Sequence, residues 1–322
     1  MGLDARFDAA FLGPMAENVA LLEELVIDAI RDHAYWRRNF HADDPPSIPE
    51  ASRYGPERQA VVSSTRHVLR RLAAALKHSV PWYSPRYIGH MSSDLLIPGV
   101  VARLLATLYN PNNVSEDASG AMVRLELEVG DQLATMVGYR VDEDAPVRGW
   151  GHLTSGGTVA NMEALWNHRA ARLAPLALAA ATRAVGLTTP VDPTLGVSIE
   201  QADPWRLANL TVDDALALQR RIQGEAHRRG GAALLRDLHD AADEATVASL
   251  GMAAFLQRHG LATPIVVVPH SAHYSWSRAV KLLGLGSAAL RHVDVDAHMR
   301  LDRDALDRVL DAAALSREPV LT

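Results

Sequence analysis

The chain has 322 residues, of which 48% are hydrophobic and 22% charged, ordinary values for a soluble globular protein of about two domains. Its net charge of −6 does not point to a nucleic-acid or anionic-membrane partner, and the absence of cysteine excludes disulfides, cysteine-ligated metals and a cysteine nucleophile. Because no apolar stretch is long enough to span a membrane, we expect a cytoplasmic protein.

The N-terminal third is predicted to be helical. Apolar residues at helical spacing indicate an amphipathic helix within 15–40, and prolines at 45, 46 and 49 then predict an extended connector. A second helix is predicted from Glu57 to Lys77. We expect this N-terminal segment to extend to about residue 115.

An aromatic segment follows between Pro81 and Asn113. Trp82, Tyr83 and Tyr87 place three of the chain's 17 aromatic residues within six positions, among prolines and polar residues. Such a composition is typical of a rigid pocket wall. A surface loop whose aromatic rings pack on the core explains it equally well.

The remainder, 116–322, has the pattern of an α/β domain. A helix is predicted over 122–136, ending at Gly138, and a helical insertion rich in alanine, leucine and arginine over about 173–260. Apolar runs at 264–269 and 291–295 are predicted strands, and each is followed by a helix, at 274–283 and 302–315. This alternation favours a mainly parallel sheet flanked by helices. Residues 318–322 resemble the start of another strand, so we expect a longer protein.

The motif Thr154-Ser155-Gly156-Gly157-Thr158 precedes a helical pattern. Together with Gly151, it superficially fits the nucleotide-binding P-loop pattern G-x-x-x-x-G-K-[ST], but Gly157 occupies the position of the required lysine, which argues against an NTPase. Exposed amides and hydroxyls at a helix start can bind a phosphate monoester. A tight strand-to-helix turn with capping hydroxyls is an equally good interpretation.

Two histidines, His270 and His273, come directly after the apolar run 265–268. Side chains at the carboxyl end of a buried strand lie where open α/β sheets bind ligands. A metal pair is conceivable at this spacing, but no third ligand is obvious, so we predict no metal site. For His273 alone, a packed structural histidine is the ordinary alternative.

Taken together, these motifs resemble the group II pyridoxal-phosphate-dependent decarboxylases, and among them the bacterial tyrosine decarboxylases. The resemblance runs from about residue 15 to the end. It is carried by the following segments in order: P-R-Y-I-G-H-M-S-S-D at 85–94, Y-N-P-N-N at 109–113, W-G-H at 150–152, T-S-G-G-T-V-A-N at 154–161 and H-Y-S-W at 273–276.

The resemblance implies an aspartate-aminotransferase-like fold, the type I fold of pyridoxal phosphate enzymes, in a homodimer with active sites at the subunit interface. Residues 1–115 would form the dimerisation segment and substrate-pocket loop, and 116–322 an incomplete cofactor-binding large domain. His273 would lie against the pyridine ring as a catalytic residue. The phosphate of pyridoxal 5′-phosphate would be held by Ser155, Gly156, Gly157 and Thr158. The substrate pocket would contain His90, Tyr87 and Asn110.

The sequence departs from the family pattern in one respect. The cofactor-tethering lysine and the aspartate that pairs with the pyridine nitrogen are expected downstream of H-Y-S-W, beyond residue 322. Of the two lysines in the chain, Lys77 precedes every motif and Lys281 follows His273 too closely. We therefore expect residues 1–322 alone to be inactive.

The predicted function is decarboxylation of an amino acid to an amine and carbon dioxide, with tyrosine as the first substrate to test. An inactive or split subunit that contributes only the phosphate-binding and ring-stacking half of the site is the main alternative. A phosphate-sensing α/β protein without a cofactor is the third.

Overall fold

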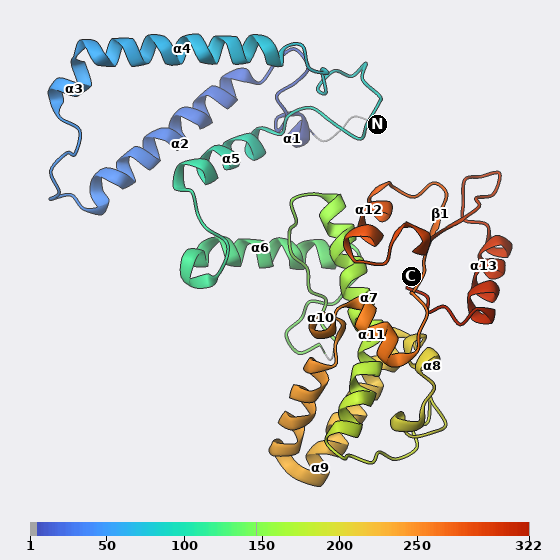
Figure 1. Cartoon of the computed structure of the whole chain (residues 1–322). Helices are drawn as coiled ribbons and strands as arrows, with labels where there is room; N and C mark the ends of the chain where they lie inside the picture. The colour runs from blue at the N-terminus through green and yellow to red at the C-terminus, as the bar shows by residue number, and fades with distance from the viewer. Residues whose placement is uncertain (1–4, 146, 322) are drawn as a thin grey trace. The chain divides into compact units, whose positions relative to one another are not determined.

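The computed structural model describes residues 5–145 and 147–321, which form two compact units, Met1–His152 and Leu153–Thr322. Among the described residues, regular strands occur only in the second unit. The first unit is built from helices throughout (Figure 1).

Within the described residues of the first unit there are six helices. Helices α2 and α4 confirm the helices predicted within 15–40 and at 57–77. Helix α6 confirms the helix predicted over 122–136 but begins earlier than expected, at Glu116. One helix, α5, lies inside the predicted loop segment 81–113 and was not expected. The bounds are α1 Ala5–Asp8, α2 Val19–Phe40, α3 Glu50–Tyr54, α4 Pro56–Leu76, α5 Ile97–Tyr109 and α6 Glu116–Met136.

Helices α2 and α5 pack against each other and supply most of the few buried side chains of this unit. Ile97, at the start of α5, is fully buried, and His33 of α2 meets Tyr109 edge-on with ring centroids 4.6 Å apart. An isolated antiparallel bridge between Phe11 and Leu96 fixes the chain that enters α5. The core of the first unit is therefore confined to one helix pair.

Helix α4 is amphipathic but has no buried residue. Its apolar side chains at helical spacing form what we call the α4 stripe: Val61, Val68, Leu72 and Leu76, which are 52–64% exposed. An apolar helix face that remains exposed within its own unit is a surface available for burial against another chain segment.

Gly130 and Gly151 make a close backbone contact in the first unit. A Cβ atom at Gly130 would stand 2.5 Å from the Gly151 carbonyl oxygen, closer than real side chains approach. Glycine at 130 therefore lets the W-G-H segment lie directly on α6, which explains why a glycine interrupts an otherwise ordinary helical sequence.

The second unit confirms the predicted parallel α/β pattern. Strands β1 (Val266–Pro269) and β2 (Leu290–Val293) are parallel, with Val266 paired with Leu290 and Pro269 with Val293. On the other side of β1, Ile265 forms a parallel bridge with Val320, as expected for a strand starting near residue 318. Strand β1 is thus central, which suits its continuous run of buried β-branched residues.

Helices cover both faces of this small sheet. Val266 and Val268 pack with Leu165 of α7 (Gly157–Ala184) and Val280 of α12 (Ser275–Leu282). Ile265 and Val267 point to the opposite face, where they pack with α13 (Arg303–Leu315). The alternation of side chains along β1 therefore creates a three-layer arrangement, with α7 and α12 on one face and α13 on the other.

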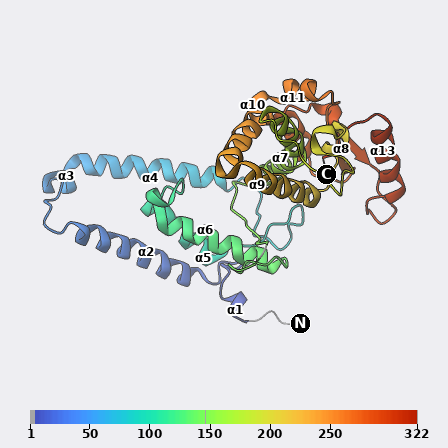
Figure 2. The same ribbon diagram turned by 90° about the horizontal axis from the view of Figure 1, so that it is seen from below.

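The predicted insertion forms a helical subdomain around the C-terminal part of α7 (Figure 2). Helix α7 spans Gly157–Ala184 and so runs unbroken across residue 173. The long α9 turns back on itself at Gly231, whose φ of 63° and ψ of −153° suit glycine. Buried residues of α7, α8, α9 and α11 share one apolar cluster. The remaining elements are η1 Ile199–Gln201, α8 Pro204–Ala208, α9 Val212–Glu244, α10 Val247–Leu250, α11 Met252–His259 and η2 Ser287–Ala289.

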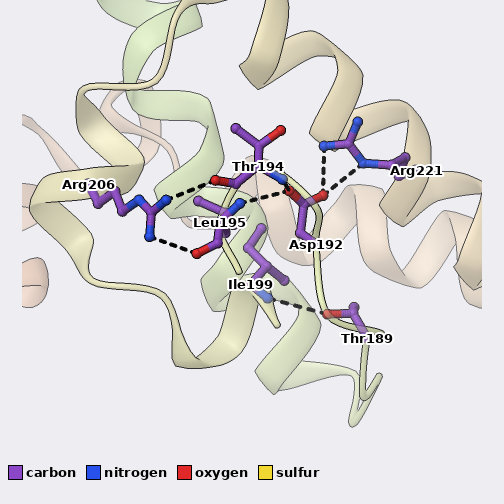
Figure 3. Close-up of polar contacts among 7 residues, drawn as sticks. All are labelled: Thr189, Asp192, Thr194, Leu195, Ile199, Arg206 and Arg221. Atoms are coloured by element: carbon purple, nitrogen blue, oxygen red, sulfur yellow. Dashed lines mark hydrogen bonds and ion pairs between the residues drawn. The ribbon is translucent and has the colours of Figure 1, made fainter. Parts of the chain in front are cut away.

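A buried carboxylate organises the loop between α7 and α8 (Figure 3). Asp192 is 5% exposed; it accepts hydrogen bonds from the amides of Thr194 and Leu195 and pairs with Arg221 of α9 at 2.6 Å. Arg206 donates to the carbonyl oxygens of the same two loop residues. The loop is therefore held to α8 and α9 largely through its main chain, and we call this group the Asp192 network.

In the sequence, the boundary between the two compact units follows His152. Helix α6 therefore belongs to the first unit. The predicted division into 1–115 and 116–322 concerned dimerisation and cofactor binding, and it stays a prediction.

Candidate active site

The segment Thr154–Thr158 forms an open turn at the start of the 28-residue helix α7. Gly156 has φ 156° and ψ 164°, a conformation in which glycine is strongly favoured, and the Thr154 hydroxyl donates to the Gly156 carbonyl at 3.1 Å. A Cβ atom at Gly156 or Gly157 would meet no other atom within 4 Å. Space therefore lies directly beside the backbone at both glycines.

The amides of Gly157 and Thr158 have no acceptor among the described residues. The N-cap Gly156 offers no side-chain cap, and neither the Ser155 nor the Thr158 hydroxyl makes a hydrogen bond within the described part of the chain. The Thr154 hydroxyl also accepts from the Gly156 amide at 3.4 Å, so the interpretation as a turn with a capping hydroxyl stands beside the phosphate interpretation. Unpaired amides, two hydroxyls and the positive end of a helix dipole remain as a donor set suited to a phosphate. We call this group the cradle.

His273 lies four residues beyond the end of β1, at the start of α12. Its Nδ1 atom is 3.2 Å from the amide nitrogen of Ser275 and 3.0 Å from the Ser275 hydroxyl oxygen. No partner of Nε2 occurs among residues 5–145 and 147–321, and the ring is exposed. The Tyr274 ring packs beside the imidazole, with ring centroids 4.1 Å apart. One edge of the imidazole is therefore anchored, and its Nε2 edge is unpaired within the described ranges.

Asn161 connects the cradle with this histidine. It lies one turn into α7, and its Nδ2 donates at 2.8 Å to the hydroxyl oxygen of the fully buried Ser275. The chain Asn161–Ser275–His273 thus joins the helix that begins at the cradle to the end of the central strand. Asn161 and Ser275 lie within the motifs that carry the resemblance, but no role was predicted for either residue. The signals in the sequence that could have identified them are the positions of the Asn161 side-chain amide, one turn into the helix, and of Ser275, two residues after His273.

His270 has different surroundings. Its Nε2 is 3.4 Å from Asp294 Oδ1, and its ring stacks on His292 with centroids 5.0 Å apart. No group of three or more histidine, aspartate or glutamate residues in the described ranges is arranged to hold a metal ion. His270 therefore contacts His292 of β2 and Asp294 just after it, whereas His273 contacts α12 and is linked through Ser275 to α7.

The predicted substrate residues all lie in the first unit. Tyr87 and His90 are joined by a hydrogen bond of 2.7 Å between the phenol oxygen and Nδ1, and the Trp82 ring packs edge-on against both. Asn110 is the C-cap of α5, in the left-handed conformation with φ 46°. Tyr87 and His90 are thus brought together, and Asn110 has a local backbone role.

The two lysines occupy helix ends. Lys281 is exposed in the last turn of α12, and Lys77 is the exposed C-cap of α4. Cations at helix C-termini are favoured by the helix dipole, so each position has an ordinary structural explanation.

Comparison with known proteins finds similarity to decarboxylases. No family model matches the chain. The L-tyrosine decarboxylases of Enterococcus faecalis and Levilactobacillus brevis are each 30% identical to it over 320 residues, which is 99% of this chain and 45% of theirs. The enzyme of Enterococcus faecium is 29% identical over 320 residues, 46% of its length. The chain spans less than half the length of these relatives.

Two solved structures are similar at lower levels. Mouse CSAD has a TM-score of 0.44, and the glutamate decarboxylase domain of a diaminobutyrate-pyruvate transaminase and L-2,4-diaminobutyrate decarboxylase from Vibrio parahaemolyticus has a TM-score of 0.46. Both are 16% identical to this chain and cover 94% of it, which corresponds to 47% and 50% of their own chains.

These relatives confirm the predicted resemblance to the bacterial tyrosine decarboxylases, and the predicted cofactor, pyridoxal 5′-phosphate, agrees with it. The α/β class with parallel strands flanked by helices is confirmed by the second unit. Within the described residues, no helix has the length and apolar character of a membrane span.

Proposed function

We propose that this chain, a relative of the bacterial L-tyrosine decarboxylases of group II, supplies the phosphate-binding and ring-stacking part of a pyridoxal-phosphate-dependent amino acid decarboxylase. The observation that carries the proposal is the hydrogen-bonded chain Asn161–Ser275–His273, because it ties a phosphate-suited helix start to an exposed imidazole within one compact unit.

The cradle fits the cofactor's phosphate. Gly156 and Gly157 leave the approach to the backbone open, and the amides of Gly157 and Thr158 lack acceptors among the described residues. The Ser155 and Thr158 hydroxyls are available as further donors. The α7 dipole favours an anion at this end, so the cradle binds the phosphate and fixes the position of one end of the molecule.

His273 fits the ring. The residue is exposed, its imidazole is fixed at Nδ1, and the Tyr274 ring lies beside it with centroids 4.1 Å apart. An imidazole held in this way suits packing flat against a planar heterocycle. Bound pyridoxal 5′-phosphate supplies an electron-withdrawing ring that stabilises the charge left on Cα when carbon dioxide departs. The part played by His273 is to hold the plane of that ring and to exclude water from one face.

For the substrate we propose an aromatic amino acid, with tyrosine first. The relatives are named for L-tyrosine, and the first unit contains a cluster of Trp82, Tyr87 and His90 whose rings contact one another. Aromatic walls with a hydrogen-bonding edge are suited to a phenol side chain. Asn110 remains a proposed substrate contact by resemblance.

We further propose that the enzyme is a homodimer with active sites at the subunit interface. The α4 stripe supports this proposal, because an exposed apolar helix face of this kind is normally buried in an assembly. A second copy of the chain is the occupant that the resemblance implies.

The phosphate role is tested by Gly157→Ala. The added methyl group meets no protein atom within 4 Å and alanine favours the helix, so stability should be kept or raised. The methyl would nevertheless occupy space needed by the phosphate, and we expect affinity for pyridoxal 5′-phosphate to fall about tenfold, as for one lost hydrogen bond to a charged group. Gly224→Ala on α9 is the matched control. Unchanged affinity in Gly157→Ala would contradict the cradle assignment.

The reaction is tested by incubating the complete protein with tyrosine and other amino acids and measuring amine and carbon dioxide. We expect a yellow protein that loses its absorption on borohydride reduction and forms tyramine from tyrosine, whereas residues 1–322 alone form none. Cofactor binding by the complete protein without turnover of any amino acid would favour the inactive or split subunit. Binding of inorganic phosphate without pyridoxal 5′-phosphate would favour a phosphate sensor.

A further inference from the structure

The hydrogen bonds at His273 determine which ring nitrogen carries the proton. The amide N–H of Ser275 is 3.2 Å from Nδ1 and can only donate, so it favours Nδ1 as an acceptor, because a hydrogen on Nδ1 would place two N–H groups against each other. A neutral imidazole with Nδ1 as acceptor has its proton on Nε2. The backbone of α12 therefore favours one tautomer.

The side chains of Ser275 and Asn161 act in the same direction. Asn161 Nδ2 donates to the Ser275 oxygen at 2.8 Å, which leaves the hydroxyl hydrogen free to point at His273 Nδ1, 3.0 Å away. Hydrogen bonds then run one way, from Asn161 to Ser275 to His273. The full burial of Ser275 protects this arrangement from competing water.

We propose that Asn161 and Ser275 are positioning residues that favour the Nε2–H tautomer of the His273 imidazole over the Nδ1–H tautomer, with the plane of the ring set relative to the cradle. The accessible edge of the ring then presents a donor N–H and no acceptor. The relevance of this orientation to a cofactor ring rests on the proposed function, whereas the tautomer itself is a property of the chain alone.

The sharpest test reverses the donor at position 161 without changing its size. In Asn161→Asp the carboxylate accepts the Ser275 hydroxyl hydrogen, so the serine oxygen turns a lone pair towards Nδ1 and favours a proton there. Nitrogen-15 spectra of histidine-labelled protein at pH 8, with His273 assigned by comparison with His273→Gln, report the tautomer ratio. We expect a change of about fivefold towards Nδ1–H, as for one neutral hydrogen bond.

Ser275→Ala supplies a second route to the same result. It removes one of the two donors to Nδ1 but leaves the amide, so the ratio should move in the same direction. The matched controls are Asn167→Asp, at an exposed site on the same helix, and Ser277→Ala, which removes a hydroxyl from the same turn of α12. Both controls should keep the wild-type spectrum.

The proposal is overturned if His273 in the unsubstituted chain lacks a predominant Nε2–H tautomer, or if folded Asn161→Asp and Ser275→Ala both retain the wild-type ratio. Neither result depends on a bound cofactor. A failure to bind pyridoxal 5′-phosphate with the expected spectra intact would contradict the proposed function alone.

Discussion

The two compact units differ in how they bury apolar residues. In the second unit, α7, α9 and α11 share a cluster that includes the fully buried Phe255, and β1 is covered on both faces. In the first unit, burial is concentrated where α2 meets α5, and α4 has no buried residue. The second unit thus has a core of its own, whereas the first presents apolar surface suited to further association.

The proposed cofactor-binding residues and the proposed substrate-binding residues therefore lie in units whose hydrophobic cores differ in extent. The cradle and His273 belong to the unit with the extensive core, and the cluster around His90 belongs to the unit with little core. We therefore expect cofactor binding to follow the stability of the second unit, and substrate binding to respond more strongly to changes in the first unit and to assembly.

The largest expected effect separates the two cores. Phe255→Ala removes a ring that is 0% exposed and should lower the free energy of unfolding by about 3–5 kcal/mol. Leu72→Ala on the α4 stripe, 52% exposed, should have a much smaller effect in the monomeric chain. Chemical denaturation of both variants measures the difference. An equal decrease in the free energy of unfolding in both variants would show that α4 is buried in the isolated chain. It would contradict the difference between the two cores.

Asp192→Asn should have the next largest effect. The substitution removes the negative charge that pairs with Arg221 and weakens the two hydrogen bonds that this side chain accepts from loop amides. The free energy of unfolding should therefore fall by about 2 kcal/mol. Asp142→Asn in the first unit disrupts an exposed pair with Arg140 and should cost no more than about 0.5 kcal/mol. The denaturant midpoints of the two variants measure this difference in stability. A larger decrease in the free energy of unfolding in Asp142→Asn than in Asp192→Asn would contradict it.

If the proposed stacking role is right, His273→Ala should weaken binding of pyridoxal 5′-phosphate by the protein about 3- to 10-fold, the value of one stacking contact. His270→Ala should have little effect, because that ring is engaged with Asp294 and His292. His90→Ala should leave cofactor affinity unchanged but raise the KM for tyrosine. Cofactor titration and steady-state kinetics separate these roles, and equal effects of the two strand-end variants would remove the stacking role of His273.

The smallest expected effect concerns pH. Burial, followed by the charges of Arg258 and Arg183, lowers the pKa of His259, whose Nε2 has no hydrogen-bond partner in the described chain. The unfolded chain therefore takes up the proton first, and stability should decline as pH falls below about 6.5. His259→Gln should flatten this decline, whereas exposed His227→Gln should not. Thermal melts between pH 5 and 8 measure it, and an unchanged slope in His259→Gln would exclude the effect.

Much of the fold was predictable because its signals are local. The buried run 265–268 indicated a central strand, and the apolar spacing within 15–40 and 57–77 indicated α2 and α4. Helix α5 was missed because Pro98 and Gly99 lie in its first turn, and their presence suggested a loop. Proline is compatible with a helix start, where its missing N–H would have no intrahelical partner.

The candidate site was predictable only in part. The glycines of the cradle and His273 stood out because their residue types suit a phosphate and a heterocycle at strand and helix ends. Asn161 and Ser275 did not, because their roles depend on a hydrogen bond between residues 114 positions apart in the sequence. Such pairings arise from tertiary packing, and a single sequence carries no periodic signal for them.

The Asp192 network places few demands on the side chains of the loop that it holds. Asp192 and Arg206 recognise amides and carbonyl oxygens of Thr194 and Leu195, groups that every non-proline residue possesses. The exposed positions of this loop are consequently free to diverge between related proteins while its path is preserved. The same property makes it a suitable place to graft a peptide tag or a fluorophore without disturbing the cradle.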